Sequence, residues 1–469
     1  MPADLVIKNG TYVLPGSTMV KDLGIIVDKG KIQSICPPEY LPEGQRTIDA
    51  TGKYVLPGLI DPHVHNRAPG YEYKEDAETC SAAAAAGGIT TTLLMFNVKP
   101  IVRDQETFQY FVDYTSQHSI VNFNVHSILV EGNFDQIPIL AKAGVASFKV
   151  LLGYKFDVSG AGGQGRPDTI GTNAPEDGGL LESMRILAEN NLVLLAHCEN
   201  DNVISRIQAG LKAKGQTGPL VHTIARPRVA SDEAISRLIA FSKDTGCHLH
   251  VIHLETGNGL QMIHKAQFEG QNVTSETCAH YLLMTHEEHM AKVGSVAKIN
   301  PPIRSQFDQD ELWKGIANGS VTVIGSDHSP HTPQEKMTDR PFDDVFQAMA
   351  GFVGVETTAP LLLTEVNKGR LTLLRLVELM STNIAKLFGL YPELGALQSG
   401  SRADVTIVDL AREGVIEASK LHSKTTVTPF DGWKVKGMPV QTIVNGKVVY
   451  DEGTVVGKPG DGKFVRAYH

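Results

Sequence analysis

Cysteine is scarce in this sequence, with five among 469 residues, an odd number without a Cys-x-x-Cys pair. Such usage favours reduced thiols over a disulfide framework or a zinc finger, so we expect a cytoplasmic protein. No apolar run approaches the length of about 20 residues that spans a bilayer, and the first residues lack the basic and hydrophobic stretches of a signal peptide. These absences predict no membrane partner.

An excess of positive charge is also missing, because 43 Lys and Arg residues face 52 Asp and Glu residues, a net charge of −9. This balance, with a pI near 6.0, argues against nucleic acid as a partner. Hydrophobic residues make up 42% of the chain, which excludes disorder as the main state. The length predicts one large domain and a smaller one.

Both ends of the chain resemble β-structure. Short β-like runs at 4–8, 24–28 and 31–35 are separated by turn residues, and similar runs occur at 404–409, 440–444 and 447–450. The last two runs flank Asn445-Gly446, a hairpin signal. We therefore predict a small β-sandwich domain formed by residues 1–56 and 397–469, with a different domain over residues 57–396.

The middle of the chain alternates apolar strand-like runs with amphipathic or alanine-rich segments. This alternation predicts an α/β protein whose middle domain is a (β/α)8, TIM-like barrel, with its chemistry at the carboxyl ends of the strands. The eight expected strands are 55–60, 89–95, 121–128, 147–152, 192–196, 248–252, 272–276 and 321–325.

Metal-binding side chains stand at the ends of four of these expected strands. His63 and His65 follow the first and are two residues apart, so in an extended chain they point the same way. His197, His253 and Asp327 end the fifth, sixth and eighth. Imidazole and carboxylate suit zinc, and the pattern therefore predicts a metal centre at one rim of the barrel.

Lys149 lies within the apolar fourth strand. Burial of an ammonium group is costly and lowers its pKa. The lysine could reach a buried carboxylate or extend to the rim. Alternatively, its neutral amine could react with CO2, giving a carbamate anion able to bridge two cations. The residues alone leave these alternatives open.

With these residues in place, the chain resembles the cyclic amidohydrolases: dihydroorotases, hydantoinases, dihydropyrimidinases and allantoinases. The resemblance includes Tyr-Val-Leu-Pro-Gly at 54–58, Leu-Phe-Gly at 387–389 and Gly-Ser-Arg-Ala-Asp at 400–404. It implies two divalent metal ions, with zinc the expected metal, and a homo-oligomer, either a dimer or a tetramer.

The resemblance also implies a role for each motif residue. His63 and His65 match ligands of the more buried metal, and His197 and His253 match ligands of the second. Lys149 matches a carboxylated lysine that bridges the two. Asp327 matches a ligand that also acts as catalytic base, taking a proton from the attacking water and giving it to the leaving ring nitrogen.

Several residues resemble the substrate site of dihydroorotases. Arg67, Asn97 and His331 match residues that hold a substrate carboxylate in that group, a task suited to an arginine. Asn300, in Lys-Ile-Asn-Pro-Pro-Ile-Arg, is a further expected substrate contact. By itself Arg67 could equally form a surface ion pair. Together these residues predict a small cyclic substrate carrying a carboxylate, opened to an N-carbamoyl acid.

Other residues favour the alternative of a neutral ring. Tyr154 matches a tyrosine that polarises the substrate carbonyl in hydantoinases and dihydropyrimidinases, although it could simply be a rim aromatic. The segments 354–371 and 429–432 resemble hydantoinases, and 276–281 is shared with allantoinases. A third possibility is a catalytically silent scaffold. Such relatives have lost metal ligands, whereas all six ligand positions are filled here.

A glycine-rich segment at 158–179 departs from all these groups. It follows the lysine strand on the catalytic face, and it lacks the sequence of a phosphate-binding loop. Long loops without secondary structure in a compact domain are usually functional lids or disordered segments. We therefore expect a mobile lid, with an inert insertion as the alternative.

Overall fold

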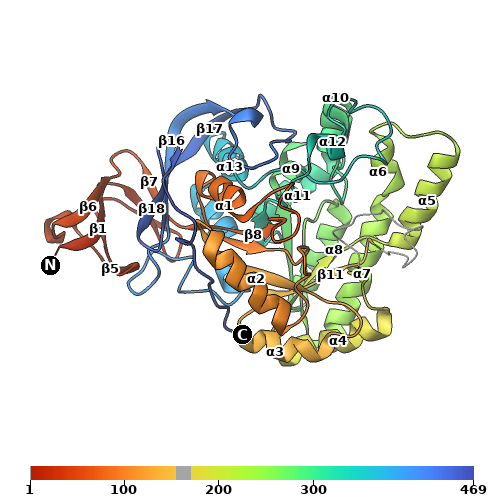
Figure 1. The fold of residues 1–469 in the computed structure, drawn as a ribbon, viewed down its shortest axis with the longest axis horizontal. Coiled ribbons are helices and arrows are strands. Elements are labelled where there is room, and N and C mark those ends of the chain that lie inside the picture. Colours follow the sequence, from red (N-terminus) through yellow and green to blue (C-terminus); the bar gives the residue numbers. More distant parts are fainter. Residues whose placement is uncertain (1, 155–170) are drawn as a thin grey trace.

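The computed structural model describes residues 2–154 and 171–469 of the chain. Figure 1 shows a small β-region at one end of the molecule and a helix-covered barrel at the other. The N-terminus lies at the outer edge of the β-region. Most of the expected lid segment, residues 158–170, lies outside the described residues, so that expectation stays a prediction.

The barrel is built from eight parallel strands whose order in space follows their order in the sequence. This arrangement confirms the predicted fold class. Strands β8 to β12 are buried along their whole length, because helices cover the outer face of a parallel barrel. The strands are β8 (Leu59–Val64), β9 (Ile89–Leu94), β10 (Asn122–Ile128), β11 (Ser147–Leu151), β12 (Val193–His197), β13 (His248–Val251), β14 (Val273–Cys278) and β15 (Val323–Gly325).

Helices connect the strands and surround the barrel (Figure 1). None of the described helices is long and apolar enough to cross a membrane. They are α1 (Ala77–Ala86), α2 (Gln105–His118), α3 (Ile137–Ala143), α4 (Asp177–Glu189), α5 (Asp201–Ala213), α6 (Val221–Ala225), α7 (Arg228–Thr245), α8 (Gly257–Phe268), α9 (Ala279–Leu283), α10 (Ala291–Val293), α11 (Gln306–Asn318), α12 (Pro333–Lys336), α13 (Thr358–Asn367), α14 (Leu373–Val377) and α15 (Asn383–Leu387).

The β-region consists of two sheets, and both ends of the chain contribute to it. One sheet has the order β5-β4-β1-β6 and the other β19-β18-β17-β16-β7-β2-β3. This confirms a β-sandwich from the two chain ends, while the domain boundaries at 56 and 397 stay predictions. The strands are β1 (Ala3–Lys8), β2 (Thr11–Leu14), β3 (Thr18–Val20), β4 (Gly24–Asp28), β5 (Lys31–Cys36), β6 (Gly44–Asp49), β7 (Tyr54–Pro57), β16 (Val405–Val415), β17 (Lys434–Val444), β18 (Lys447–Asp451) and β19 (Thr454–Val455).

The expected first barrel strand at 55–60 is wrong in its bounds. Residues 54–57 form β7, which pairs with β16 and β2 in the sandwich, and the barrel strand β8 begins only at Leu59. Gly58 separates them, where an added Cβ would lie 2.1 Å from the Thr90 hydroxyl oxygen. The apolar residues continue from β7 into β8, so the hydrophobic pattern does not show where the sandwich ends and the barrel begins. As a consequence, His63 lies inside a barrel strand instead of after one.

Hydrogen bonds between the first and last barrel segments close the ring of strands. The backbone N–H of His65 donates to the carbonyl of His328 at 2.8 Å, and Val64 and His328 form an isolated parallel bridge. Two residues before His328, the Ser326 N–H donates to the Asp61 carboxylate at 3.1 Å. This closure brings the His-x-His motif beside the segment that follows β15.

A buried aspartate links the barrel to the sandwich and generates a stability prediction. Asp404 accepts hydrogen bonds from the Asn122 side chain on β10 and from the Asn445 backbone, each at 2.7 Å. Asp404→Ala should lower the free energy of unfolding by about 1–3 kcal/mol, because it leaves buried donors without their acceptor. Urea unfolding measures this change.

Glu413→Ala is the control for that measurement. Glu413 lies on β16 in an exposed ion pair with Lys436, and such pairs contribute about 0–1 kcal/mol. Equal losses in the two variants would contradict the assigned role of Asp404.

Candidate active site

A cavity at the carboxyl ends of the barrel strands contains all six predicted metal-binding residues. The empty space within it is about 490 Å³, open solvent at its mouth included. Asn97, Tyr154 and Asn300 also line it, together with Ser329, which was not predicted. The predicted site residues on its wall are His63, His65, Asn97, Lys149, Tyr154, His197, His253, Asn300 and Asp327.

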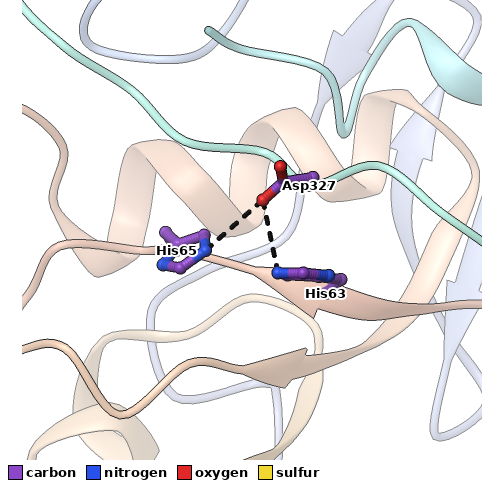
Figure 2. A group of neighbouring side chains, drawn as sticks. All are labelled: His63, His65 and Asp327. Atoms are coloured by element: carbon purple, nitrogen blue, oxygen red, sulfur yellow. Dashed lines mark ion pairs between the residues drawn. The ribbon is translucent and has the colours of Figure 1, made fainter. Parts of the chain in front are cut away.

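His63, His65 and Asp327 form the first candidate metal-binding group of this cavity (Figure 2). The Nε2 atoms of His63 and His65 lie 3.2 and 3.4 Å from Oδ1 of Asp327. One donor atom from each residue falls within 4.8 Å of the others. Two imidazoles and a carboxylate at this spacing are a suitable donor set for a divalent ion.

Two ring nitrogens lie close together at the ends of the neighbouring strands β12 and β13. They belong to His197, which ends β12, and to His253, which follows β13. Nδ1 of His197 and Nε2 of His253 are 2.9 Å apart. Two nitrogen lone pairs facing each other at this distance repel unless a proton or a cation lies between them. A zinc ion, which binds imidazole nitrogen at about 2.0–2.1 Å, could be held by both atoms.

Lys149 lies against His63, which in turn lies near His253 of the second histidine pair. Its Nζ lies 3.0 Å from Nε2 of His63, and the ring centroid of His63 is 5.4 Å from that of His253. The lysine is 2% exposed, so it does not extend to solvent at the rim. Burial lowers the pKa of Lys149 to about 8, which increases the fraction of neutral amine at physiological pH.

Three of the four histidines hydrogen-bond a side-chain oxygen through the ring nitrogen that faces away from the other predicted ligands. This contact selects the tautomer and leaves the second nitrogen unprotonated toward the cavity. Sequence reasoning missed Glu276 and Glu199 in this role, although a carboxylate two residues after His197 is a usable signal. The pairs are His63 with Glu276 (2.8 Å), His65 with Asn97 (2.7 Å) and His197 with Glu199 (2.8 Å).

Tyr154 and Asn300 lie side by side on the cavity wall. The Asn300 amide donates a hydrogen bond to the Tyr154 hydroxyl oxygen at 3.0 Å. The Tyr154 ring packs against His197, with centroids 4.9 Å apart. Both side chains therefore share the cavity wall with the predicted metal ligands.

Arg67 and His331 are not among the described residues that line the cavity. Arg67 is 1% exposed, so it is not a surface ion pair. Its guanidinium donates to the hydroxyl of Ser329 at 2.6 Å and to the carbonyl of Pro330, and it lies 3.3 Å from His331. Lys74, which was not predicted, lies 3.2 Å from the other nitrogen of His331. Arg67 therefore holds the segment after Asp327 by two hydrogen bonds, and it adjoins the cavity wall through Ser329.

Among the described residues, eleven that are not glycine have a positive φ, and three of these lie at or next to the cavity. Arg67, His253 and Asp327 have φ values of 63°, 38° and 47°. Residues other than glycine rarely adopt this left-handed conformation, and a fold retains it where surrounding contacts require it. Strain at two predicted metal ligands is consistent with a functional site.

A family model described as the amidohydrolase family matches residues 54–449. Among curated proteins, the chain is 36% identical to an L-hydantoinase of Paenarthrobacter aurescens, with 98% of each chain covered. It is 35% identical to an allantoinase of Rubrobacter xylanophilus, covering 99% of this chain and 97% of that protein. It is 34% identical to a dihydroorotase of Geobacter sp., covering 96% of this chain and all of that protein.

The fold has a similarly extensive match among solved structures. An L-hydantoinase (dihydropyrimidinase) from Arthrobacter aurescens superposes with a TM-score of 0.92 at 35% sequence identity. The match covers 99% of this chain and 100% of that one. Both the barrel and the sandwich are therefore shared with that protein.

Proposed function

The chain belongs to the amidohydrolase family, and on this premise we propose that it hydrolytically opens a cyclic amide or ureide ring to an N-carbamoyl acid. The observation that carries the proposal is the single cavity in which six metal-binding side chains meet Tyr154 and Asn300. A screen of ring opening across dihydroorotate, allantoin, dihydrouracil and 5-substituted hydantoins tests it. Absence of hydrolysis of every ring by the zinc-loaded protein would contradict it.

The donor set supports two divalent ions, for which we propose zinc. His63 and His65 would hold one ion, His197 and His253 the other, and Asp327 and a carboxylated Lys149 would complete the centre. When bound, the ions would lower the pKa of water toward about 7 and so supply a nucleophile at neutral pH. A neutral Lys149 amine, favoured by burial, can react with CO2 to form the proposed carbamate.

The chain's own side chains would guide the proton and the substrate. Oδ1 of Asp327, close to both His63 and His65, would accept the proton of the attacking water and give it to the leaving ring nitrogen. Because Asn300 donates to the Tyr154 oxygen, the phenol proton is directed to another acceptor. We propose that the substrate carbonyl takes this position during turnover, which would stabilise the developing oxyanion.

Contacts on the cavity wall favour a neutral ring, the hydantoinase-like alternative, over a carboxylated one. Tyr154 lines the cavity, as do Asn97 and Asn300 of the dihydroorotase-like set, whereas the Arg67 guanidinium, the expected carboxylate partner, already donates to Ser329 and Pro330. The carboxylated, dihydroorotase-like ring remains the second candidate. The buried Arg67 contacts the Ser329 hydroxyl and lies beside His331, so a modest side-chain shift would bring its guanidinium to an anion in the cavity.

The protein is expected to be a cytoplasmic homo-oligomer, a dimer or a tetramer. Its five cysteines are free thiols, as expected in a reducing compartment. Sedimentation velocity tests the assembly. A silent scaffold, the remaining alternative, would purify without stoichiometric zinc.

Lys149 provides a test of the two-metal centre. Lys149→Ala should lose most bound metal and activity, because the bridging anion is absent, and added short-chain carboxylates should partly restore both. Metal analysis and hydrolysis rate are the measurements. A variant that keeps two metals and the full rate would refute the proposed carbamate.

Asp327 provides a test of the proton path. Asp327→Asn should reduce kcat by about 10²–10⁴, the usual range for loss of general acid–base catalysis, while part of the metal is retained. Steady-state kinetics over a range of pH check this outcome. A near-normal kcat and pH profile would remove Asp327 from the mechanism.

Two variants measured on two substrates distinguish the substrate classes. For a neutral ring, Tyr154→Phe should lower kcat and Arg67→Ala should have little effect. For a carboxylated ring, Arg67→Ala should lower kcat/KM by about one to two powers of ten, since charged hydrogen bonds contribute about 1.5–3 kcal/mol. A 5-substituted hydantoin and dihydroorotate are the paired substrates. If Tyr154→Phe changes neither rate, the proposed carbonyl contact does not exist.

A further inference from the structure

Two neighbouring barrel strands end in the same pattern, a histidine followed two residues later by a glutamate. The residues are His197, the last of β12, with Glu199, and His253, two residues after β13, with Glu255. Both glutamates are buried. Only Glu199 accepts a hydrogen bond from its own histidine, whereas Glu255 contacts Ser231 and Arg304. Identical spacing therefore leads to two different environments.

Glu199 is held by a buried arginine. Its Oε2 atom accepts from Nη1 of Arg226 and from Nε2 of His197 at 2.8 Å. Both members of the pair are almost fully buried, at 0% and 1% exposure. One carboxylate oxygen thus joins a guanidinium to the ring of a predicted metal ligand, in the manner that increases the basicity of the opposite ring nitrogen.

Arg226 also packs against the candidate carbonyl-polarising tyrosine. Its guanidinium carbon lies 5.8 Å from the centroid of the Tyr154 ring, within range of a cation–π contact. The same ring lies 4.9 Å from that of His197. Arg226 is therefore in contact with Tyr154 directly and with His197 through Glu199.

The absence of a side chain at Gly153 leaves room for the contact between His197 and Glu199. A Cβ atom at position 153 would lie 2.8 Å from Nε2 of His197 and 3.0 Å from Cβ of Glu199. Real Cβ contacts essentially never occur below 3.0 Å, so any side chain here would displace the hydrogen-bonded pair. The chain just before Tyr154 is thus closely packed on the His197–Glu199 contact.

The backbone of Arg226 is itself restrained. Its carbonyl accepts a hydrogen bond from Nη1 of Arg304, and Arg304 forms a buried ion pair with Glu255 at 2.9 Å. Pro227 follows directly, which limits the conformations of the residue before it. Arg226 can therefore serve as a fixed support for the groups that it contacts.

We propose that Arg226 and Glu199 form a positioning unit that sets His197 as a metal ligand and Tyr154 as a substrate contact at the same time. The effect on Tyr154 rests on the proposed function, whereas the effect on His197 requires only that the centre binds metal. The unit touches neither substrate nor metal itself.

Metal binding by the purified protein tests the first half. Apo-protein of each variant is titrated with Zn²⁺, and with Co²⁺ followed by its visible spectrum. Glu199→Gln should weaken the affinity for the second ion about 10–100-fold and alter the cobalt spectrum. Glu365→Gln is the control, a buried glutamate on α13 that pairs with Lys368 and Arg370 and does not line the cavity, and it should retain the wild-type affinity and spectrum.

Two further variants keep the test decisive if Glu199→Gln fails to fold. Arg226→Lys preserves the positive charge and should bind metal more tightly than Arg226→Met. Gly153→Ala preserves every charge and should still weaken metal binding by displacing His197. Unchanged affinity and an unchanged spectrum in the folded variants would overturn the proposal, as would equal losses in Glu199→Gln and Glu365→Gln.

Kinetics test the second half separately. With saturating zinc, Arg226→Lys should lower kcat on a hydantoin more than it raises KM, because Tyr154 would act mainly in the transition state. A change confined to KM would overturn the link to Tyr154. If the wild-type protein hydrolyses none of the rings while metal binding still depends on Glu199, the proposed function fails and the positioning of His197 stands.

Discussion

The candidate site depends on closure of the barrel between β8 and the segment after β15. The hydrogen bond from His65 to the His328 carbonyl and the bond from Ser326 to Asp61 join the first strand to the last. They bring the His-x-His motif from one end of the barrel sequence within 3.4 Å of Asp327 at the other. Loss of this closure would separate the first metal-binding group even if every residue in it were retained.

Burial of charge is the second constraint on this centre. Lys149, Glu199, Arg226 and Glu276 are all nearly inaccessible to solvent, and isolated charges in such positions are strongly unfavourable. Most are offset by direct partners, as in the Arg226–Glu199 pair. Burial raises the pKa of Glu276 well above its ordinary value, and it lowers that of His63. Cations in the cavity would oppose the first shift, because they favour the carboxylate, and would add to the second, because they favour the unprotonated imidazole.

Under the proposed function, the choice of substrate would depend on which side chains reach the cavity wall. Tyr154 and Asn300 form part of its wall, whereas Arg67 reaches the wall through the hydroxyl of Ser329. If Arg67 replaced Ser329 at the cavity wall, the site would suit a carboxylate; with Arg67 outside the wall it suits a neutral carbonyl. Relatives named hydantoinase, allantoinase and dihydroorotase, all about one-third identical to this chain, are consistent with small changes of this kind.

The sequence by itself determined the barrel, the sandwich and the six residues expected to bind metal, because apolar runs and short motifs depend on neighbouring positions. It could not determine that the chain passes from the sandwich strand β7 to the barrel strand β8 at Gly58, since hydrophobicity continues across this point. It also could not distinguish Glu199 from Glu255, which have the same spacing from a histidine, or place Arg67 behind Ser329. These features were decided by tertiary structure, because the direction and partners of a buried polar side chain depend on groups that are distant in the sequence.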